Sequence, residues 1–365
     1  MSSTSAGGER ARPTAGPLLL RRRLALAIAL LATATTPACG RSVPASGPAT
    51  VRATPLPADE LRAATRLGPG AQLVGGWWLT SDDPRLGGLS GVLADRDRLV
   101  LVSDRGWLWT VDRTQPGATE LVAGSWRVRE LVSGGQPPDA EALARDEAGR
   151  ILVATEGTHG IARLPDRLRG SRLELVAIPL PKSLSRLPVN QGVEALATLP
   201  DGRLLAIAEA GRDDLHLAAI LGGGTSRALV YRSAPGFAPT GADQGAGWLL
   251  VLERRFSPLT GLAARVTAIP VEQVDVPEGT IAPSTEVARL AGPGVVDNME
   301  GIAAEPIDGG DGLRLWLVSD DNFSPLQRTL LIVVEWRPQG LARASSRRFM
   351  RTSAAGSSAS PTERR

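Results

Sequence analysis

Short apolar runs separated by turn residues dominate the chain, and this pattern is typical of β-hairpins. Towards the C-terminus, an apolar run at residues 302–304 follows Glu300, and a Gly/Asp-rich turn leads to a second run at residues 313–318. This second run ends on the acidic pair Asp320 and Asp321. In a hairpin, the start of the first strand and the end of the second lie at the same edge. The pattern therefore predicts that these acids face one side of the molecule.

The same two-strand unit recurs along the chain. Its starts are Ser90, Glu141, Glu194, Asp243 and Glu300. The ends of its second run are marked by Asp104, Glu156, Glu209, Glu253 and Asp320. Successive starts are 51, 53, 49 and 57 residues apart, and further β-like runs in each interval give about four strands per unit. This period is typical of propeller blades. The sequence thus predicts an all-β fold with a single β-propeller, with five repeats counted and six blades as the alternative.

The last unit contains only three clear strands, which end at Trp336. A strand-like run at residues 72–80 precedes the first unit and is available as a fourth strand. We therefore predict that this N-terminal strand completes the last blade and closes the propeller.

The N-terminus has the features of a secretory signal. A polar, basic stretch ends in three arginines at residues 21–23, a short apolar run follows at residues 24–32, and small residues come next. Export to the periplasm, the cell envelope or the medium is expected, by either the general secretory or the twin-arginine route. Cys39, the single cysteine, lies in a segment similar to a lipoprotein box. A lipid on Cys39 would attach the protein to a membrane, and the alternative is a plain signal peptide with an incidental cysteine.

Composition divides the chain into four parts. Residues 1–39 form the signal, and residues 40–66 are Pro/Ser/Ala-rich and are predicted to be a linker with a short helix at 58–66. Residues 67–341 form the propeller domain, and residues 342–365 form a disordered tail. Arginine is concentrated in the two ends, so the central part is net negative although the whole chain is formally +3. This charge distribution argues against a nucleic-acid partner.

Several motifs resemble those of the bacterial phytase-like domain family, whose members are described by "esterase-like activity of phytase". The motifs are Gly-Gly-Leu-Ser-Gly at 87–91, Leu-Glu-Arg-Arg-Phe-Ser-Pro-Leu-Thr-Gly-Leu at 252–262, Asn-Met-Glu-Gly-Ile-Ala at 298–303 and Ser-Asp-Asp-Asn-Phe-Ser-Pro-Leu-Gln-Arg-Thr at 319–329. They occur in the expected order over about residues 70–337. The family is named by analogy with β-propeller phytases, which hold phosphate esters with calcium ions in an acidic channel. The resemblance thus implies a propeller and ester chemistry.

If the first strand of each unit lines the axis, the recurring acids converge at one mouth of the channel. Crowded carboxylates repel one another, and a calcium ion, which prefers six to eight oxygen ligands, would relieve the repulsion. The alternative is that the acids cap turns and pair with arginine. The candidate metal ligands are Asp104, Glu141, Glu156, Glu194, Glu209, Glu253, Glu300, Asp320, Asp321 and Asn322.

Arg105, Arg254 and Arg328 lie beside acidic motifs and could bind a phosphate or carboxylate, although salt bridges to neighbouring acids are the alternative. His159 is a candidate general base, with a surface-loop histidine as the alternative. With only two histidines, a three-histidine zinc site is excluded. Ser90 lies in Gly-Leu-Ser-Gly-Val and lacks the second glycine of the hydrolase nucleophile elbow Gly-x-Ser-x-Gly. The sequence therefore does not support a hydrolase with a serine catalytic triad.

Three hypotheses for the function follow. The first is a calcium-dependent hydrolase that acts on a small-molecule phosphate or carboxylic ester. The second is a non-catalytic propeller that binds a ligand or partner and uses the cation for structure. The third is a propeller enzyme directed at sugars or lactones. The chain is expected to act as a monomer.

Overall fold

The structure is a computed structural model. It describes residues 44–338 except 158–159, 179, 182–183, 185–186, 188–190, 223–224, 276–278, 293–294 and 308–310. The predicted signal segment, Cys39, His159 and the C-terminal tail therefore lie outside the described residues. Among the described residues, no helix is long and apolar enough to cross a membrane.

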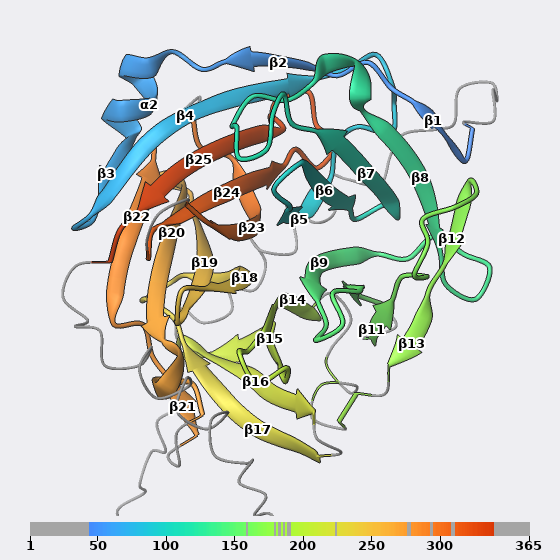
Figure 1. The fold of residues 1–365 in the computed structure, drawn as a ribbon. Coiled ribbons are helices and arrows are strands. Elements are labelled where there is room, and N and C mark those ends of the chain that lie inside the picture. Colours follow the sequence, from blue (N-terminus) through green and yellow to red (C-terminus); the bar gives the residue numbers. More distant parts are fainter. Residues whose placement is uncertain are drawn as a thin grey trace, which may run out of the picture. The chain divides into compact units, whose positions relative to one another are not determined.

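The described part of the chain forms a β-propeller of five sheets, mainly antiparallel (Figure 1). The strands of the first sheet, from inside outwards, are β5 (Leu89–Ala94), β6 (Arg98–Ser103), β7 (Trp107–Asp112) and β8 (Arg127–Val132). Those of the second are β9 (Ala140–Arg145), β10 (Ile151–Thr155), β11 (Gly160–Arg163) and β13 (Val176–Ile178). Those of the third are β14 (Val193–Thr198), β15 (Leu204–Arg212), β16 (Leu215–Gly222) and β17 (Thr225–Arg232).

The last two sheets follow the same order. The fourth consists of β18 (Ala238–Gly245), β19 (Trp248–Ser257), β20 (Gly261–Pro270) and β22 (Thr285–Ala291). The fifth consists of β23 (Asn298–Pro306), β24 (Leu313–Asp320), β25 (Leu330–Trp336) and β4 (Ala71–Thr80). The innermost strands β5, β9, β14, β18 and β23 contact one another in a closed ring around the axis. The count of five repeats is thereby confirmed for the described residues.

Closure by the N-terminal strand is confirmed as well. Strand β4 pairs antiparallel with β25, with Trp78 opposite Leu330 and Ala71 opposite Trp336. The first and last parts of the domain therefore share one sheet, so the ring cannot open without breaking this pairing.

Packing between neighbouring sheets explains why the strands are apolar almost without interruption. The buried side chains form five clusters, and each one fills the space between two adjacent blades. Both faces of a blade are thus covered, and alternation of polar and apolar residues is lost. Trp109, Trp126 and Trp316 fill the junction of the fifth and first blades. The rings of Trp109 and Trp126 pack edge to face, with their centroids 6.2 Å apart.

The segment predicted to be a linker is instead attached to the propeller. Strands β1 (Ser46–Pro48), β2 (Arg52–Pro55) and β3 (Thr65–Leu67) pair with β8, β4 and β22, and helix α2 (Ala58–Ala64) lies between β2 and β3. The physical reason is that outer blade strands leave backbone N–H and C=O groups free, which any short extended segment can pair with. Such strands carry no apolar pattern, so composition alone indicates a tether.

The remaining elements extend the blade edges or their connections. Strands β12 (Arg172–Glu174) and β21 (Thr280–Ile281) pair in parallel with β8 and β17. The short helices η2 (Ala123–Ser125) and η3 (Val271–Gln273) lie in connections.

Asp243, taken from the sequence as the start of the fourth unit, lies in the middle of β18 instead. Its carboxylate accepts hydrogen bonds from the backbone N–H of Ala304 (2.8 Å) and of Gln244 (2.7 Å), and so joins the inner strands of the fourth and fifth blades. Burial raises its pKa to about 6, although the two backbone donors act in the opposite direction.

We expect Asp243→Ala to lower the free energy of unfolding by about 1–3 kcal/mol, because the Ala304 N–H would lose its acceptor at a partly buried position. Chemical denaturation measures this change. Asp59→Ala on α2, whose side chain is 96% exposed, is the control and should change stability by less than about 0.5 kcal/mol. Equal effects of the two substitutions would contradict this role of Asp243.

Candidate functional site

Each blade carries a β-bulge at the same place, near the start of its innermost strand. At these five points the register between the first and second strands shifts by one residue. A bulge leaves one residue unpaired and changes the direction of its side chain. The unpaired residues are Ser90, Glu141, Glu194, Thr240 and Glu300.

A small residue, Gly or Ala, follows every bulge, because the inner strands approach closely there. A Cβ atom added at Gly241 would lie 2.8 Å from the backbone oxygen of Glu300, and one at Gly301 would lie 3.1 Å from the backbone oxygen of Ser90. The pattern of a polar residue followed by a small residue therefore has a packing cause. It also brings the polar side chains of neighbouring blades close together.

A second set of residues ends the second strand of each blade, at the same edge of the sheets. Asp104 and Glu156 donate their backbone N–H to the segments that lead into β5 and β9, and Glu209 does the same for β14. Asp320 pairs with Asn298 at the start of β23. In the fourth blade this place is taken by Arg254, opposite Ala238. The acids at the ends of the second strands of four blades, and the arginine of the fourth blade, thus lie at the same edge of the sheets as the bulge residues.

Together these positions form what we call the acidic ring. Its carboxylates are those of Asp104, Asp139, Glu141, Glu156, Glu194, Glu209, Glu300 and Asp320.

Two groups connect the members of the acidic ring. The Arg254 guanidinium lies 3.2 Å from Glu300 and 3.7 Å from Glu209. The Asn298 amide donates hydrogen bonds to Glu300 (2.7 Å) and Asp320 (3.3 Å).

Burial and mutual repulsion shift the titration of the ring. Burial is the main cause that raises the pKa of Glu300 to about 8, of Asp104 to about 7 and of Asp320 to about 6. Burial also raises the pKa values of Glu141 and Glu194, and repulsion between these two acids and Glu300 adds to it. Negative charge is therefore costly here without a cation.

Three atoms of the ring have no hydrogen-bond partner among the described residues although they are buried. They are Oδ1 of Asp104, Oε2 of Glu300 and Nε of Arg254. Three further acids, Asp139, Glu141 and Glu156, can bring one oxygen each within 4.8 Å of one another. This group has the donor atoms and the spacing to hold a metal ion.

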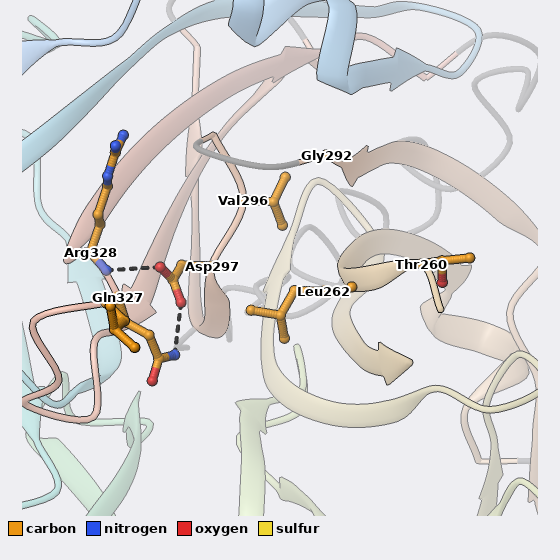
Figure 2. A pocket seen from close by; sticks show the side chains of 9 residues that line it. Thr260, Leu262, Gly292, Val296, Asp297, Gln327 and Arg328 are labelled. Atoms are coloured by element: carbon orange, nitrogen blue, oxygen red, sulfur yellow. Dashed lines mark hydrogen bonds between the residues drawn. The ribbon is translucent and has the colours of Figure 1, made fainter. Parts of the chain in front are cut away.

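A cavity of about 370 Å³ opens at the same edge of the sheets, between the fourth and fifth blades. Figure 2 shows Leu262 and Val296 beside the Asp297 carboxylate. Asp297 accepts hydrogen bonds from the Gln327 amide and from the backbone N–H of Arg328, both 2.8 Å. Asp297 thereby fixes the loop after β24 to the start of β23, directly next to Asn298.

A sequence profile described as Phytase-like (esterase-like activity of phytase) matches residues 84–323. The chain belongs to this family. The matched region runs from just before the first bulge to the loop after β24, so it includes every residue of the acidic ring. Among curated proteins, none matches this chain.

Solved structures resemble this phytase-like domain only distantly. A gluconolactonase from Xanthomonas campestris is 13% identical with a TM-score of 0.37, and the match covers 82% of this chain and 99% of that one. A glutaminyl cyclase from Myxococcus xanthus is 13% identical with a TM-score of 0.40, and the match covers 73% of this chain and 97% of that one. A PQQ-bound aldose sugar dehydrogenase from Streptomyces coelicolor is 15% identical with a TM-score of 0.39, and the match covers 73% of this chain and 99% of that one. These values give no indication of the substrate of the phytase-like domain.

Two predicted ligands lie away from the acidic ring. The Glu253 carboxylate is buried between the third and fourth blades, where it accepts hydrogen bonds from the Tyr231 hydroxyl (2.5 Å) and Arg265 (2.7 Å). Asp321 accepts the backbone N–H groups of Gly88 and Phe323, both at 3.0 Å, and caps the loop after β24. Both carboxylates thus have structural partners.

The side chains of the other loop candidates also face elsewhere. The exposed Asn322 donates to Gln327 (3.2 Å), and Arg105 lies over the Phe323 ring at 3.3 Å. The Arg328 guanidinium lies 4.8 Å from the centre of the Trp78 ring, and in Figure 2 its side chain extends away from Leu262. Arg254 contacts the ring acids Glu300 and Glu209 directly. His159 lies outside the described residues.

Asp139 and Thr240 were not predicted from the sequence. Alignment of two motifs would have found the first, because Asp139-Ala-Glu-Ala-Leu-Ala corresponds to Asn298-Met-Glu-Gly-Ile-Ala. Thr240 is followed by Gly241, as Ser90 is followed by Gly91, so the polar–small pair was the available signal.

Proposed function

We propose that this chain is an exported, calcium-dependent hydrolase of small-molecule phosphate or carboxylic esters that acts at the acidic ring. The observation that carries the proposal is the convergence of buried and half-buried carboxylates from four blades, of which Glu300 and Glu209 contact Arg254. Two of these carboxylates, Asp104 and Glu300, each have an oxygen without a hydrogen bond in the described part of the chain. Such an arrangement is unfavourable for a structural role and suits a cation.

The residues present fit calcium. Calcium takes six to eight oxygen ligands from carboxylates, carbonyls and water. Asp139, Glu141 and Glu156 are the closest group of acids and would hold the ion. Asp104 and Glu300 offer their free oxygens, and a histidine or cysteine ligand, which zinc would favour, is not found in this group.

When bound, the ion would supply positive charge that polarises an ester and stabilises the charge that develops on it. The protein adds the Arg254 guanidinium, whose Nε has no partner among the described groups and whose donors suit phosphate or carboxylate oxygens. Asn298 holds Glu300 and Asp320 in place through its two hydrogen bonds. The site would thus be organised before the substrate binds, which favours electrostatic stabilisation of the transition state.

An activity panel tests this proposal. The purified protein should hydrolyse p-nitrophenyl phosphate or p-nitrophenyl acetate in calcium and lose that activity in EDTA. Glu141→Gln should lower the rate about 100-fold or more, because a ligand would be lost. Glu60→Gln, on the exposed face of α2, is the matched control and should leave the rate unchanged. A rate that is the same in calcium and in EDTA would exclude calcium dependence.

Export, a monomeric state and membrane attachment through Cys39 also belong to the proposal. Mass spectrometry of protein purified from the native cells should show that the chain starts at or near Cys39. A diacylglyceryl mass on Cys39 would establish the lipoprotein form, and its absence the plain secreted form. An intact segment 1–38 in the cytosolic fraction would contradict export.

A further inference from the structure

The hairpin formed by β19 and β20 extends past the acidic ring. Both strands have ten residues, compared with six each in β6 and β7. Strand β19 continues three residues beyond Arg254, which corresponds to about 10 Å of extended chain. The hairpin therefore forms a wall beside the acidic ring.

One face of this wall changes from charged to apolar with distance from the ring. Residues two apart on a strand share a face, so Phe256 lies on the same face as Arg254. Across the hairpin, Phe256 pairs with Leu262 and Arg254 pairs with Ala264. Phe256 is 52% exposed, and Leu262 lines the cavity between the fourth and fifth blades. The apolar face thus continues directly from the arginine of the candidate site.

The opposite wall of the cavity adds two apolar side chains to its polar ones. It contains Val296, next to Asp297, and Leu326 in the loop after β24 (Figure 2 shows Val296 and Leu262). Leu326 is 92% exposed and Leu259, at the tip of the hairpin, is 96% exposed. Leu262, Val296 and Leu326 line the cavity, and Phe256 and Leu259 belong to the hairpin that forms one of its walls; we call this group of five side chains the apolar cleft.

A single exposed leucine is ordinary, but here the exposed Leu326 lines a cavity next to a charged site, and the exposed Phe256 and Leu259 lie on the hairpin beside it, which points to a ligand. The volume of about 370 Å³ lies within the range of small-molecule sites. The polar lining groups nearest to the ring, Asp297 and Gln327, already bond to each other and to the loop. The lining is therefore mixed, and its apolar contacts come from Leu262, Val296 and Leu326.

We propose that the substrate is amphiphilic: its ester group lies at the acidic ring, and an apolar alkyl or aryl group of the same molecule lies in the apolar cleft. This inference rests on the proposed function for the position of the ester. We assign the cleft to the apolar group of the substrate because Arg254, at the ring, and Phe256, at the cleft, lie on the same face of β19. One molecule can therefore contact both. A second copy of the chain is the competing occupant of the cleft.

Alkylphosphonates are suitable probes. They resemble a phosphate ester and also the tetrahedral intermediate of carboxylic ester hydrolysis, and they are not hydrolysed. Calorimetric titration with methyl-, butyl- and octylphosphonate in calcium should show affinity rising about fourfold for each methylene until the cleft is filled. Leu326→Ser and Phe256→Ser, both at exposed positions and therefore compatible with folding, should weaken octylphosphonate binding about tenfold or more. They should leave methylphosphonate binding unchanged.

Val176→Ser is the control, because Val176 is 52% exposed on the outer strand of the second blade. It should not alter binding of any of the three probes. Affinity independent of chain length, or no binding of octylphosphonate, would overturn the inference. So would a dimer in sedimentation that Leu326→Ser dissociates, since a second copy would then occupy the cleft. Chain-length-dependent binding without ester hydrolysis would refute the proposed function and keep the apolar subsite. Ester hydrolysis without chain-length-dependent binding would support the proposed function and refute the apolar subsite.

Discussion

Saturating calcium should raise the melting temperature of this protein by about 5–10 °C, and EDTA should remove the increase. A ligand at about a hundred times its dissociation constant stabilises the folded state by about 2.7 kcal/mol. Each kcal/mol moves the melting temperature of a domain of this size by about 2–4 °C. The effect arises because the ring acids repel one another in the folded state and separate on unfolding.

Glu300→Gln separates the site from general effects of salt. The substitution removes one ionisable group and one ligand at nearly constant shape, so at pH 8 and above, where Glu300 is ionised without calcium, the protein should become more stable and the calcium shift should shrink. Glu60→Gln makes the same chemical change on the exposed face of α2 and should leave the calcium shift unchanged. Equal calcium shifts in the wild type and both variants would mean that the ion does not bind at the ring.

The shift should also depend on pH. The pKa values of Asp320, Asp104 and Glu300 are raised to about 6, 7 and 8, so the folded protein binds more protons than the unfolded chain above pH 4. Without calcium, the stabilising contribution of these protons is complete below about pH 4 and is lost as the pH rises towards 8. Calcium needs the deprotonated acids, so its shift should grow over the same interval. Differential scanning calorimetry at pH 5 and pH 8 measures both trends.

The sequence predicted the architecture because that architecture depends on repeated local signals. Paired apolar runs, turn residues and the period of the units indicated blades, and the strand at residues 72–80 was the missing partner for the last one. Strands β1, β2 and β3 could not be predicted in this way. Their pairing is decided by open edges of blades that are distant in the sequence.

The positions of the candidate site could be predicted in the blades whose motifs are regular. In the fourth blade, whose motif is irregular, the predicted position was one residue away from the observed one. In the fourth blade, the second strand continues through Glu253 into Arg254. A shift of one residue in a strand exchanges its two faces. Glu253 therefore points into the core between two blades, whereas Arg254 points to the ring. Nothing in a single sequence marks which of two adjacent charged residues has which face.

Arg254→Gln should lower kcat/KM for an ester substrate by about 100- to 1000-fold, the usual effect of removing one donor from a site that stabilises developing charge. Arg254→Lys should retain part of the activity, since it keeps the charge and loses the fork of donors. Arg255→Gln is the matched control: Arg255 is the next residue on β19, faces the other way and lies 4.9 Å from the centre of the Phe237 ring.

Calcium binding gives a second measurement for the same variant that does not depend on catalysis. Arg254 is the positive charge closest to Glu300 and Glu209, at 3.2 and 3.7 Å, and it opposes a cation that binds to the same carboxylates. Its removal should therefore tighten calcium binding and enlarge the calcium-induced shift in melting temperature, while activity falls. A variant that loses activity and calcium binding together would show that Arg254 organises the ring instead of contacting the substrate. A variant that keeps full activity would exclude Arg254 from the reaction.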